Sequence, residues 1–285
     1  MKIGVPIYEY RRLYPLEQLP EKMKAHGIDS VDYADLYNTE SKLFGLDEES
    51  FKEVLTYERG VLESGGITVH QIHGPWRYPP KDGTAEERRQ MLEAMKKGVR
   101  AAVYLGASCM VVHPLMPYGE EGLEQRTSIF DINTEHFTAL SEYAKDFPVT
   151  VCIENMPYPR FPISTVEQVL ELVKHVHKDN VKVCLDTGHA NALGTNPADA
   201  VRLLGQYLAA LHVHDNDGRS DAHLHIGEGT IDWQDFSAAL REIGFLGVVS
   251  AEPNMRGNFT PEEKEKRQAL LAKNLRKIAD GAWNC

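Results

Sequence analysis

The sequence predicts a single (β/α)8 barrel domain over residues 1–285. Eight short apolar runs of strand length recur along the chain, and segments with helical periodicity separate them. This alternation takes up about 250 residues, the usual size of such a barrel. An open doubly wound sheet is the competing architecture, but it usually has about five or six strands. The predicted strands are 3–8, 30–36, 68–73, 109–113, 150–154, 182–186, 209–214 and 247–252.

The predicted helices have apolar residues that recur three or four positions apart. A final helix is predicted from Thr260, a candidate N-cap, followed by Pro261 in the first turn and by Glu263, which completes a capping box. Two segments that contain proline and glycine, 74–83 and 114–131, are interpreted as loops after the third and fourth strands. The other predicted helices lie at 15–26, 84–105, 164–175 and 232–243.

The chain is acidic, with 42 Asp and Glu against 31 Lys and Arg and a net charge of −11. This balance argues against a protein that coats nucleic acid or an anionic membrane. The amino terminus lacks a signal-peptide pattern, and no apolar run reaches the roughly 18 residues of a membrane span. Cys109, Cys152 and Cys184 lie in apolar runs, as buried thiols do in a reducing compartment. We therefore expect a cytoplasmic protein.

Histidines and carboxylates stand at the ends of the later predicted strands or in the segments that follow them. The carboxyl ends of parallel barrel strands meet at one rim, where active sites of this fold are built. Five histidines and four carboxylates are therefore expected to converge there, although they are scattered over 180 positions of sequence. They are His73, His113, Glu154, Asp186, His189, His212, Asp221, His223 and Glu252.

Four carboxylates in one barrel mouth repel each other and cannot all stay ionised unaided. A divalent cation offsets two of these charges, and the mixed donors suit Zn²⁺ or Mn²⁺ rather than Ca²⁺. The sequence thus implies at least one metal ion, with room for up to three. His214 lies on the same strand face as His212, and is either a ligand or a supporting group. His70 is interpreted as structural, and four histidines in helical segments or at their ends are interpreted as solvated: His26, His136, His175 and His177.

These residues resemble the pattern of the xylose-isomerase-like TIM-barrel superfamily, which contains sugar and sugar phosphate isomerases and epimerases, dehydratases and the endonuclease IV group. The resemblance covers essentially the whole chain. Its most specific stretches are 152–155, 184–189 and 221–223, the last of which runs into 226–229. It implies one metal ion held as in the epimerase branch by Glu154, Asp186, His212 and Glu252. Five more residues match the further ligands of the three-zinc endonuclease IV cluster: His73, His113, His189, Asp221 and His223.

The chain also departs from both branches. Ketose 3-epimerases carry an arginine a few residues beyond the histidine of the seventh strand, whereas here 215–218 fills that stretch and Arg219 comes late. The early loops, with Tyr8 to Arg12 and the segment 33–38, differ from the DNA-penetrating loops of endonuclease IV. The pattern therefore leaves the substrate open.

The first functional hypothesis is a metal-dependent isomerase or epimerase for a sugar, a sugar phosphate or a cyclitol. A divalent ion polarises a carbonyl, and Glu154 and Glu252 then remove and return a proton from the neighbouring carbon. The expected partner is a small carbohydrate, and the size is also compatible with a homo-oligomer. Candidate substrate-binding residues are His113, His189, Trp76, Tyr8 and Arg219.

Two alternatives remain on the same site. One is a multi-zinc phosphodiesterase or abasic-site endonuclease of the endonuclease IV type, which the nine-residue match supports and the acidic net charge opposes. The other is a keto-sugar dehydratase or lyase.

Overall fold

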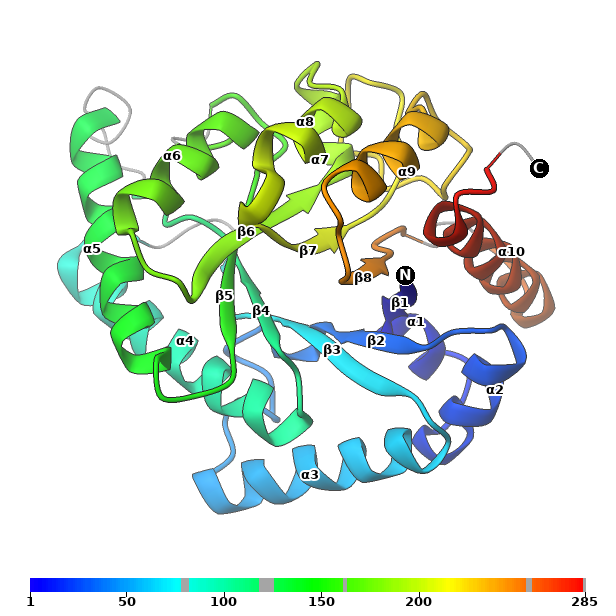
Figure 1. The fold of residues 1–285 in the computed structure, drawn as a ribbon. Helices are drawn as coiled ribbons and strands as arrows, with labels where there is room; N and C mark the ends of the chain where they lie inside the picture. Colours follow the sequence, from blue (N-terminus) through cyan, green and yellow to red (C-terminus); the bar gives the residue numbers. More distant parts are fainter. Residues whose placement is uncertain (78–81, 118–125, 161–162, 255–257, 284–285) are drawn as a thin grey trace.

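The computed structural model describes residues 1–77, 82–117, 126–160, 163–254 and 258–283. Eight parallel strands form one sheet in the order β7-β6-β5-β4-β3-β2-β1-β8, and helices surround it (Figure 1). This arrangement confirms the predicted (β/α)8 barrel. The strands are β1 (Lys2–Pro6), β2 (Ser30–Tyr33), β3 (Thr68–His73), β4 (Cys109–Val112), β5 (Thr150–Glu154), β6 (Val181–Asp186), β7 (Leu208–His212) and β8 (Val248–Ser250).

The barrel closes between β7 and β8 at the carboxyl rim. Within the described residues, an isolated parallel bridge between Val213 and Ala251 joins these two strands. The amide of Val213 donates to the Ser250 carbonyl at 2.8 Å, and the amide of Glu252 donates to the Val213 carbonyl at 3.0 Å. We call this junction the seam.

Each strand is followed by helical structure that covers the outside of the barrel. Short 3₁₀ helices occur at η1 (Leu16–Gln18), η2 (Ala34–Leu36) and η3 (Gly205–Tyr207). Among the described helices, none combines the length and apolar character of a membrane span. The α-helices are α1 (Ile7–Arg11), α2 (Leu19–Ala25), α3 (Glu48–Ser64), α4 (Ala85–Leu105), α5 (Arg126–Ala144), α6 (Val166–Val176), α7 (Thr187–Ala192), α8 (Pro197–Leu204), α9 (Trp233–Glu242) and α10 (Pro261–Asp280).

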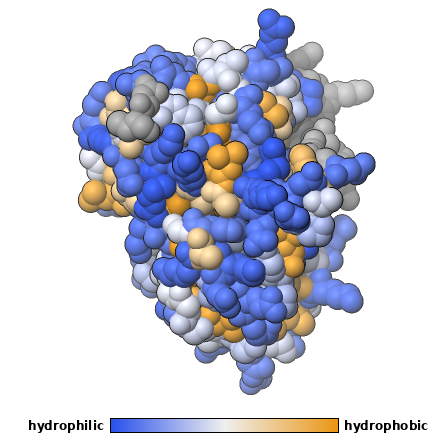
Figure 2. All heavy atoms as spheres, turned by 90° about the vertical axis from the view of Figure 1, so that its right-hand side faces the viewer, coloured by the Kyte–Doolittle hydropathy of each residue, from blue (hydrophilic) through white to orange (hydrophobic). Residues whose placement is uncertain are grey.

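The predicted capping box of the last helix is confirmed. The Thr260 side chain accepts from the amide of Glu263, whose carboxylate accepts from the amide of Thr260, and Pro261 opens α10. The same reciprocal cap, at Thr84 and Thr165, begins α4 and α6. The face that carries α10 and α2 is largely hydrophilic, with small separate hydrophobic patches (Figure 2).

Several predicted boundaries differ from the structure. The first strand ends at Pro6, because proline has no amide hydrogen to continue the ladder, and α1 begins at Ile7. The second ends at Tyr33, where η2 begins. The loop predicted over 114–131 is too long, since α5 begins at Arg126. Strands β7 and β8 are likewise shorter than the predicted segments, but their ends stay at the same rim.

Three cysteines lie on barrel strands: Cys109 on β4, Cys152 on β5 and Cys184 on β6. Cys152 and Cys184 are buried with Val111 and Ala210, as predicted, whereas Cys109 is only half-buried. Cys285 lies outside the described residues.

The predictions for the peripheral histidines were partly wrong. His175 and His177 are exposed as expected, but His26 is half-buried and its Nδ1 lies 2.8 Å from the Tyr10 hydroxyl. His136, predicted to be solvated, is only 6% exposed because the inner face of α5 packs it against α4, with Nε2 3.3 Å from Met95 Sδ. His70 hydrogen bonds through Nδ1 to Ser30 Oγ at 2.9 Å, in agreement with a structural role.

The burial of His136 makes stability sensitive to acid. Burial lowers the pKa of His136 to about 4, so the folded protein keeps the ring neutral while the unfolded chain binds a proton below about pH 6.5. Lowering the pH from 7 to 5 therefore favours the unfolded chain, by about 2 kcal/mol from this residue. We expect His136→Leu to remove that part of the pH dependence in urea denaturation of chelator-treated protein. Parallel wild-type and variant curves over this pH range would contradict the prediction.

Candidate metal centre

The carboxyl rim of the barrel gathers all nine residues predicted to converge there. His73, Glu154, Asp186 and His212 are the last residues of β3, β5, β6 and β7, and the other five lie just beyond strand ends or in the segments that follow. Six are at most 9% exposed, while Asp221, His223 and Glu252 are half-buried at the mouth. Among the described residues, four groups of donors lie close enough together to share an ion, and three of these groups contain Glu154. One of them joins Cys184 to Glu154 and His212, and the other three groups are called the central, second and third sets.

The central set contains Glu154, Asp186, His212 and Glu252, with one donor atom from each residue within 4.8 Å of all the others. His212 Nδ1 lies 2.6 Å from Glu154 Oε1 and 3.3 Å from Glu252 Oε2. The four predicted ligands of a single ion are therefore adjacent in space, although they come from β5, β6, β7 and the segment just beyond β8.

The second set shares Glu154 with two histidines. Glu154 Oε2 lies 3.1 Å from His113 Nε2 and 3.9 Å from His73 Nε2. The two imidazoles meet edge to face, with ring centroids 5.0 Å apart. Glu154 thus directs one oxygen to each of the first two sets.

The third set contains His189, Asp221, His223 and also His214. Asp221 Oδ1 lies 3.1 Å from His223 Nε2 and 3.6 Å from His189 Nε2. The ring of His214 stacks on that of His223 at 3.8 Å, and its Nε2 lies 3.0 Å from the Asp186 carboxylate. His214 therefore connects the third set to the central one.

Backbone carbonyls orient three of these histidines in the same way. The Nδ1 atoms of His73, His189 and His223 lie 2.7–2.9 Å from the carbonyl oxygens of Gly74, Asn155 and Glu252, respectively. A carbonyl oxygen only accepts, so Nδ1 carries the hydrogen and Nε2 remains free to bind an ion. These rings are held in a ligand-ready orientation.

Local backbone structure fixes Asp186. It is the N-cap of α7, and its Oδ1 accepts from the amide of His189 at 2.6 Å. Asn155 bonds both the amide and the carbonyl of Asp186 and so locks the ends of β5 and β6 together. Gly188 is required beside it, because a Cβ there would lie 2.0 Å from Cε1 of His214.

The loop after β7 carries the third set and is organised by Asp215, which is fully buried. Its carboxylate accepts from the amides of Gly227 and Ile231, and from Nε1 of Trp233 at 2.9 Å. His223 has a φ of 46°, a left-handed conformation that costs energy in a non-glycine residue. The hydrogen bonds of Asp215 thus hold the loop in one conformation, which positions Asp221 and His223.

The electrostatics of the rim fit a cation. Burial opposes the ionisation of Glu154, but His212 and His113 outweigh it and hold its pKa well below the usual range. Burial, with Glu154 nearby, raises the pKa of Glu252 to about 8. Among the described residues, Glu154 Oε2 and Asp221 Oδ1 are buried carboxylate oxygens without a hydrogen-bond partner. A divalent ion would satisfy such oxygens, so these residues fit the implied metal.

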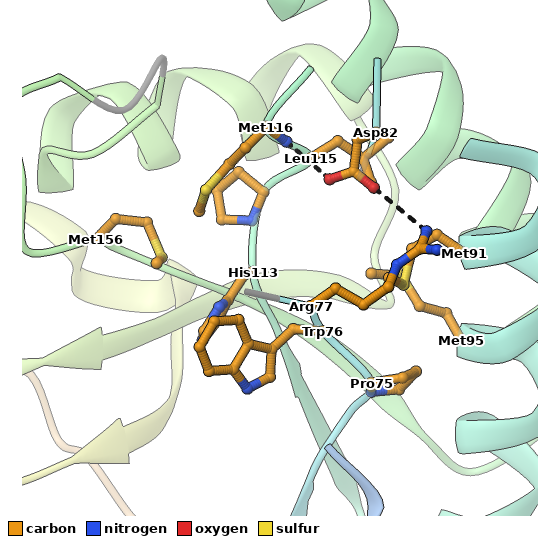
Figure 3. Close-up of a pocket in the computed structure, with 11 residues that line it drawn as sticks. Pro75, Trp76, Arg77, Asp82, Met91, Met95, His113, Leu115, Met116 and Met156 are labelled. Carbon is orange, nitrogen blue, oxygen red and sulfur yellow. Dashed lines mark hydrogen bonds and ion pairs between the residues drawn. The ribbon is translucent and has the colours of Figure 1, made fainter. Parts of the chain in front are cut away.

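An apolar cavity of about 30 Å³ adjoins the second set (Figure 3). Trp76 and His113 lie together on one side of it, with ring centroids 4.9 Å apart, and the Arg77–Asp82 ion pair lies across from them. Trp76 therefore has the location expected of a pocket wall. The other residues that line the cavity are apolar: Pro75, Met91, Met95, Pro114, Leu115, Met116 and Met156.

The other two predicted substrate contacts differ in position. Tyr8 is half-buried in α1, two residues beyond the end of β1. Burial, followed by the charge of Glu252, raises the pKa of its phenol well above the usual value. Arg219 is exposed on the loop after β7, with its amide bonded to Asp217.

Sequence reasoning missed Asp32, the penultimate residue of β2. It is 2% exposed, and its Oδ2 lies 3.0 Å from Nε2 of His212. The signal was available, because an acidic residue near a strand end resembles the other rim positions. The predicted strand 30–36 ran past the true end at Tyr33 and so hid it.

The fold and the site together define a TIM-barrel protein whose rim carries a candidate metal centre of histidines and carboxylates. The model of the xylose isomerase-like TIM barrel family matches residues 20–279, and the chain belongs to this family.

Two relatives illustrate the sequence similarity. An uncharacterised protein of Methanocaldococcus jannaschii is 34% identical over 187 residues, which cover 64% of this chain and 63% of that protein. An inosose isomerase of Bacillus velezensis is 25% identical over 296 residues, covering 95% of this chain and 90% of the relative.

Two crystal structures are similar over nearly the full length. A D-tagatose 3-epimerase-like protein is 26% identical with a TM-score of 0.77, covering 98% of this chain and 99% of that one. The IOLI protein, crystallised with a zinc atom, is 22% identical with a TM-score of 0.75, covering 99% and 98%. The second likeness concerns the fold alone.

Proposed function

We propose that this protein is a divalent-metal-dependent isomerase or epimerase acting on a sugar, a sugar phosphate or a cyclitol. The observation that carries the proposal is the central set, in which two glutamates from β5 and from beyond β8 flank the same donor cluster. Relatives named for inosose isomerisation and for tagatose 3-epimerase likeness support it.

The residues at the rim divide the chemistry between them. A bound divalent ion supplies Lewis acidity, which polarises a substrate carbonyl and acidifies the adjacent C–H bond. Glu154 and Glu252 approach the centre from different strands, so one removes the proton and the other returns it. His113 and His189 bind substrate hydroxyls through Nε2. Tyr8, which stays a neutral phenol, and Trp76 wall the site and exclude water.

A second candidate function is phosphodiester hydrolysis. The specific observation in its favour is that the central and second sets share Glu154, while His214 of the third set lies 3.0 Å from Asp186 of the central set. Three ions in such sets can generate hydroxide and stabilise a leaving oxygen. The acidic net charge of −11 weighs against a nucleic-acid substrate.

We further propose Zn²⁺ or Mn²⁺ as the ion, because the donors mix imidazole and carboxylate. Residues 1–285 would form one domain of a cytoplasmic protein of carbohydrate metabolism. Whether the protein forms a homo-oligomer is a question for a measurement of its mass in solution. Each of these points is open to direct assay.

Metal removal tests the centre itself. Dialysis against a strong chelator is expected to abolish turnover, and returning Zn²⁺ or Mn²⁺ to restore it. Elemental analysis of the purified protein should then find one ion per chain if it is an isomerase, and two or three if the phosphodiesterase alternative holds. Full activity in protein free of divalent ions would contradict the proposal.

A substrate panel tests the reaction. Aldoses, ketoses, inososes and keto-glycosides, free and phosphorylated, are incubated with Mn²⁺- or Zn²⁺-loaded protein in deuterated water. Isomerisation or epimerisation by proton transfer incorporates solvent deuterium next to the carbonyl. In parallel, DNA with an abasic site is assayed for nicking in excess Zn²⁺. Nicking without sugar turnover would replace the first function with the second.

A further inference from the structure

Asp32 connects two strands on different sides of the barrel. It lies in β2, and its Oδ2 reaches Nε2 of His212 at the end of β7, 180 residues away, at 3.0 Å. Both residues are at most 2% exposed. Asp32 lies outside the four donor sets that would hold an ion.

A second buried side chain fixes the orientation of Asp32. Gln71 Nε2 donates to Asp32 Oδ2 at 2.7 Å and lies 3.4 Å from the Leu211 carbonyl. A register shift between β2 and β3 pairs Gln71 with Asp32 and brings its side chain into the barrel. The carboxylate oxygen is therefore held between Gln71 and His212.

This contact determines which nitrogen of His212 can bind an ion. An ionised carboxylate only accepts, so Nε2 of His212 carries the hydrogen that points to Asp32. Nδ1 then faces Glu154 and Glu252 at 2.6 and 3.3 Å. This is the reverse of His73, His189 and His223, which present Nε2 and donate from Nδ1 to neutral carbonyls.

We propose that Asp32 is a positioning residue that fixes the ring and tautomer of His212 and presents Nδ1 to the divalent ion. The inference rests on the metal centre required by the proposed function. A carboxylate partner makes an imidazole ligand more basic than a carbonyl partner does. Among His73, His189, His212 and His223, His212 is thus the histidine whose affinity for the ion depends most on its supporting contact.

The test measures metal affinity in the full chain. Asp32→Asn keeps the shape of the side chain but removes its charge, and we expect the Kd for Zn²⁺, measured by competition with a chromophoric chelator, to rise about 10–100-fold. Ser30→Ala is the matched control. Ser30 is fully buried on the same strand but bonds to Thr68 and His70, so its Kd should stay at the wild-type value.

A double-mutant cycle separates positioning from general damage to the barrel. In a His212→Asn background, where the imidazole is absent, Asp32→Asn should change the Kd by less than about 3-fold. The visible absorption of the Co²⁺-loaded protein should change in Asp32→Asn and stay unchanged in Ser30→Ala. Gln71→Met, which frees the Asp32 carboxylate, is a second variant and should raise the Kd by a smaller factor.

An unchanged Kd and Co²⁺ spectrum in Asp32→Asn would overturn the role of Asp32 while leaving the metal centre intact. Equal losses in the wild-type and His212→Asn backgrounds would also overturn it. If Asp32→Asn does not fold, an unchanged Kd in Gln71→Met would overturn the role of Asp32. Failure of the wild-type protein to bind any ion would instead remove the metal centre, and the proposed function with it.

Discussion

Replacing Glu154 with glutamine is expected to lower kcat/KM by about 10⁴-fold or more. Glu154 belongs to three of the four donor groups at the rim, and in the proposed mechanism it also transfers a proton. The amide keeps the size of the side chain but has neither the charge that an ion requires nor the basicity that proton removal requires. The measurement is turnover of whichever panel substrate is active, together with the ion content of the variant.

The control for this variant is Glu171→Gln, which makes the same chemical change on the exposed side of α6. Its activity and ion content should equal those of the wild type. If Glu154→Gln folds and keeps more than about a tenth of the wild-type activity, the site is wrongly placed.

Replacing Asp215 with alanine is expected to lower the free energy of unfolding by about 3–5 kcal/mol. The change leaves the buried amide of Ile231 and the buried indole N–H of Trp233 without their acceptor, and each such loss costs about 1–3 kcal/mol. It also removes the acceptor of the amide of Gly227, which is an exposed residue. Activity should fall as well, because the same loop carries Asp221 and His223. Urea denaturation and turnover measure the two effects.

Asp217→Ala is the matched control in the same loop. Asp217 is exposed, and its carboxylate accepts from the turn amides of Arg219 and Ser220 and from the Ser220 hydroxyl. Because water can replace this carboxylate, its loss should cost about 1 kcal/mol or less. Asp215→Asn keeps one acceptor oxygen, so its free energy of unfolding should lie between those of Asp215→Ala and Asp217→Ala. Equal stabilities of the Asp215→Ala and Asp217→Ala variants would show that the buried carboxylate does not organise the loop.

Much of the fold and of the rim could be predicted because the relevant signals are local. Strand-length apolar runs at regular intervals identify the barrel, and in a parallel barrel the strand ends converge whatever the loops do. Glu154 and Asp186 stand at the ends of clear apolar runs, so their place followed from the topology. His73 and His212 were found in the same way.

What could not be predicted depends on contacts between distant segments. The burial of His136 follows from how α5 packs on α4, which the sequence around it does not reveal. The contact between Asp32 and His212 crosses the barrel, and no local pattern links the two residues. The roles of Asn155 and Asp215 are likewise set by the backbone groups that surround them. His214 was ambiguous until its ring was seen stacked on His223.

The position of the seam between β7 and β8 implies that ion binding also stabilises the closure of the barrel. Two backbone hydrogen bonds at Val213 close the barrel there, and His212 and Glu252 stand on opposite sides of that junction. An ion bound by both residues would cross-link the two sides of the seam, because β7 and β8 could separate only after one of the two ligands is released. Breathing of the barrel would then be tied to ion release, and amide hydrogens along the seam would exchange more slowly in the loaded protein than in the stripped one.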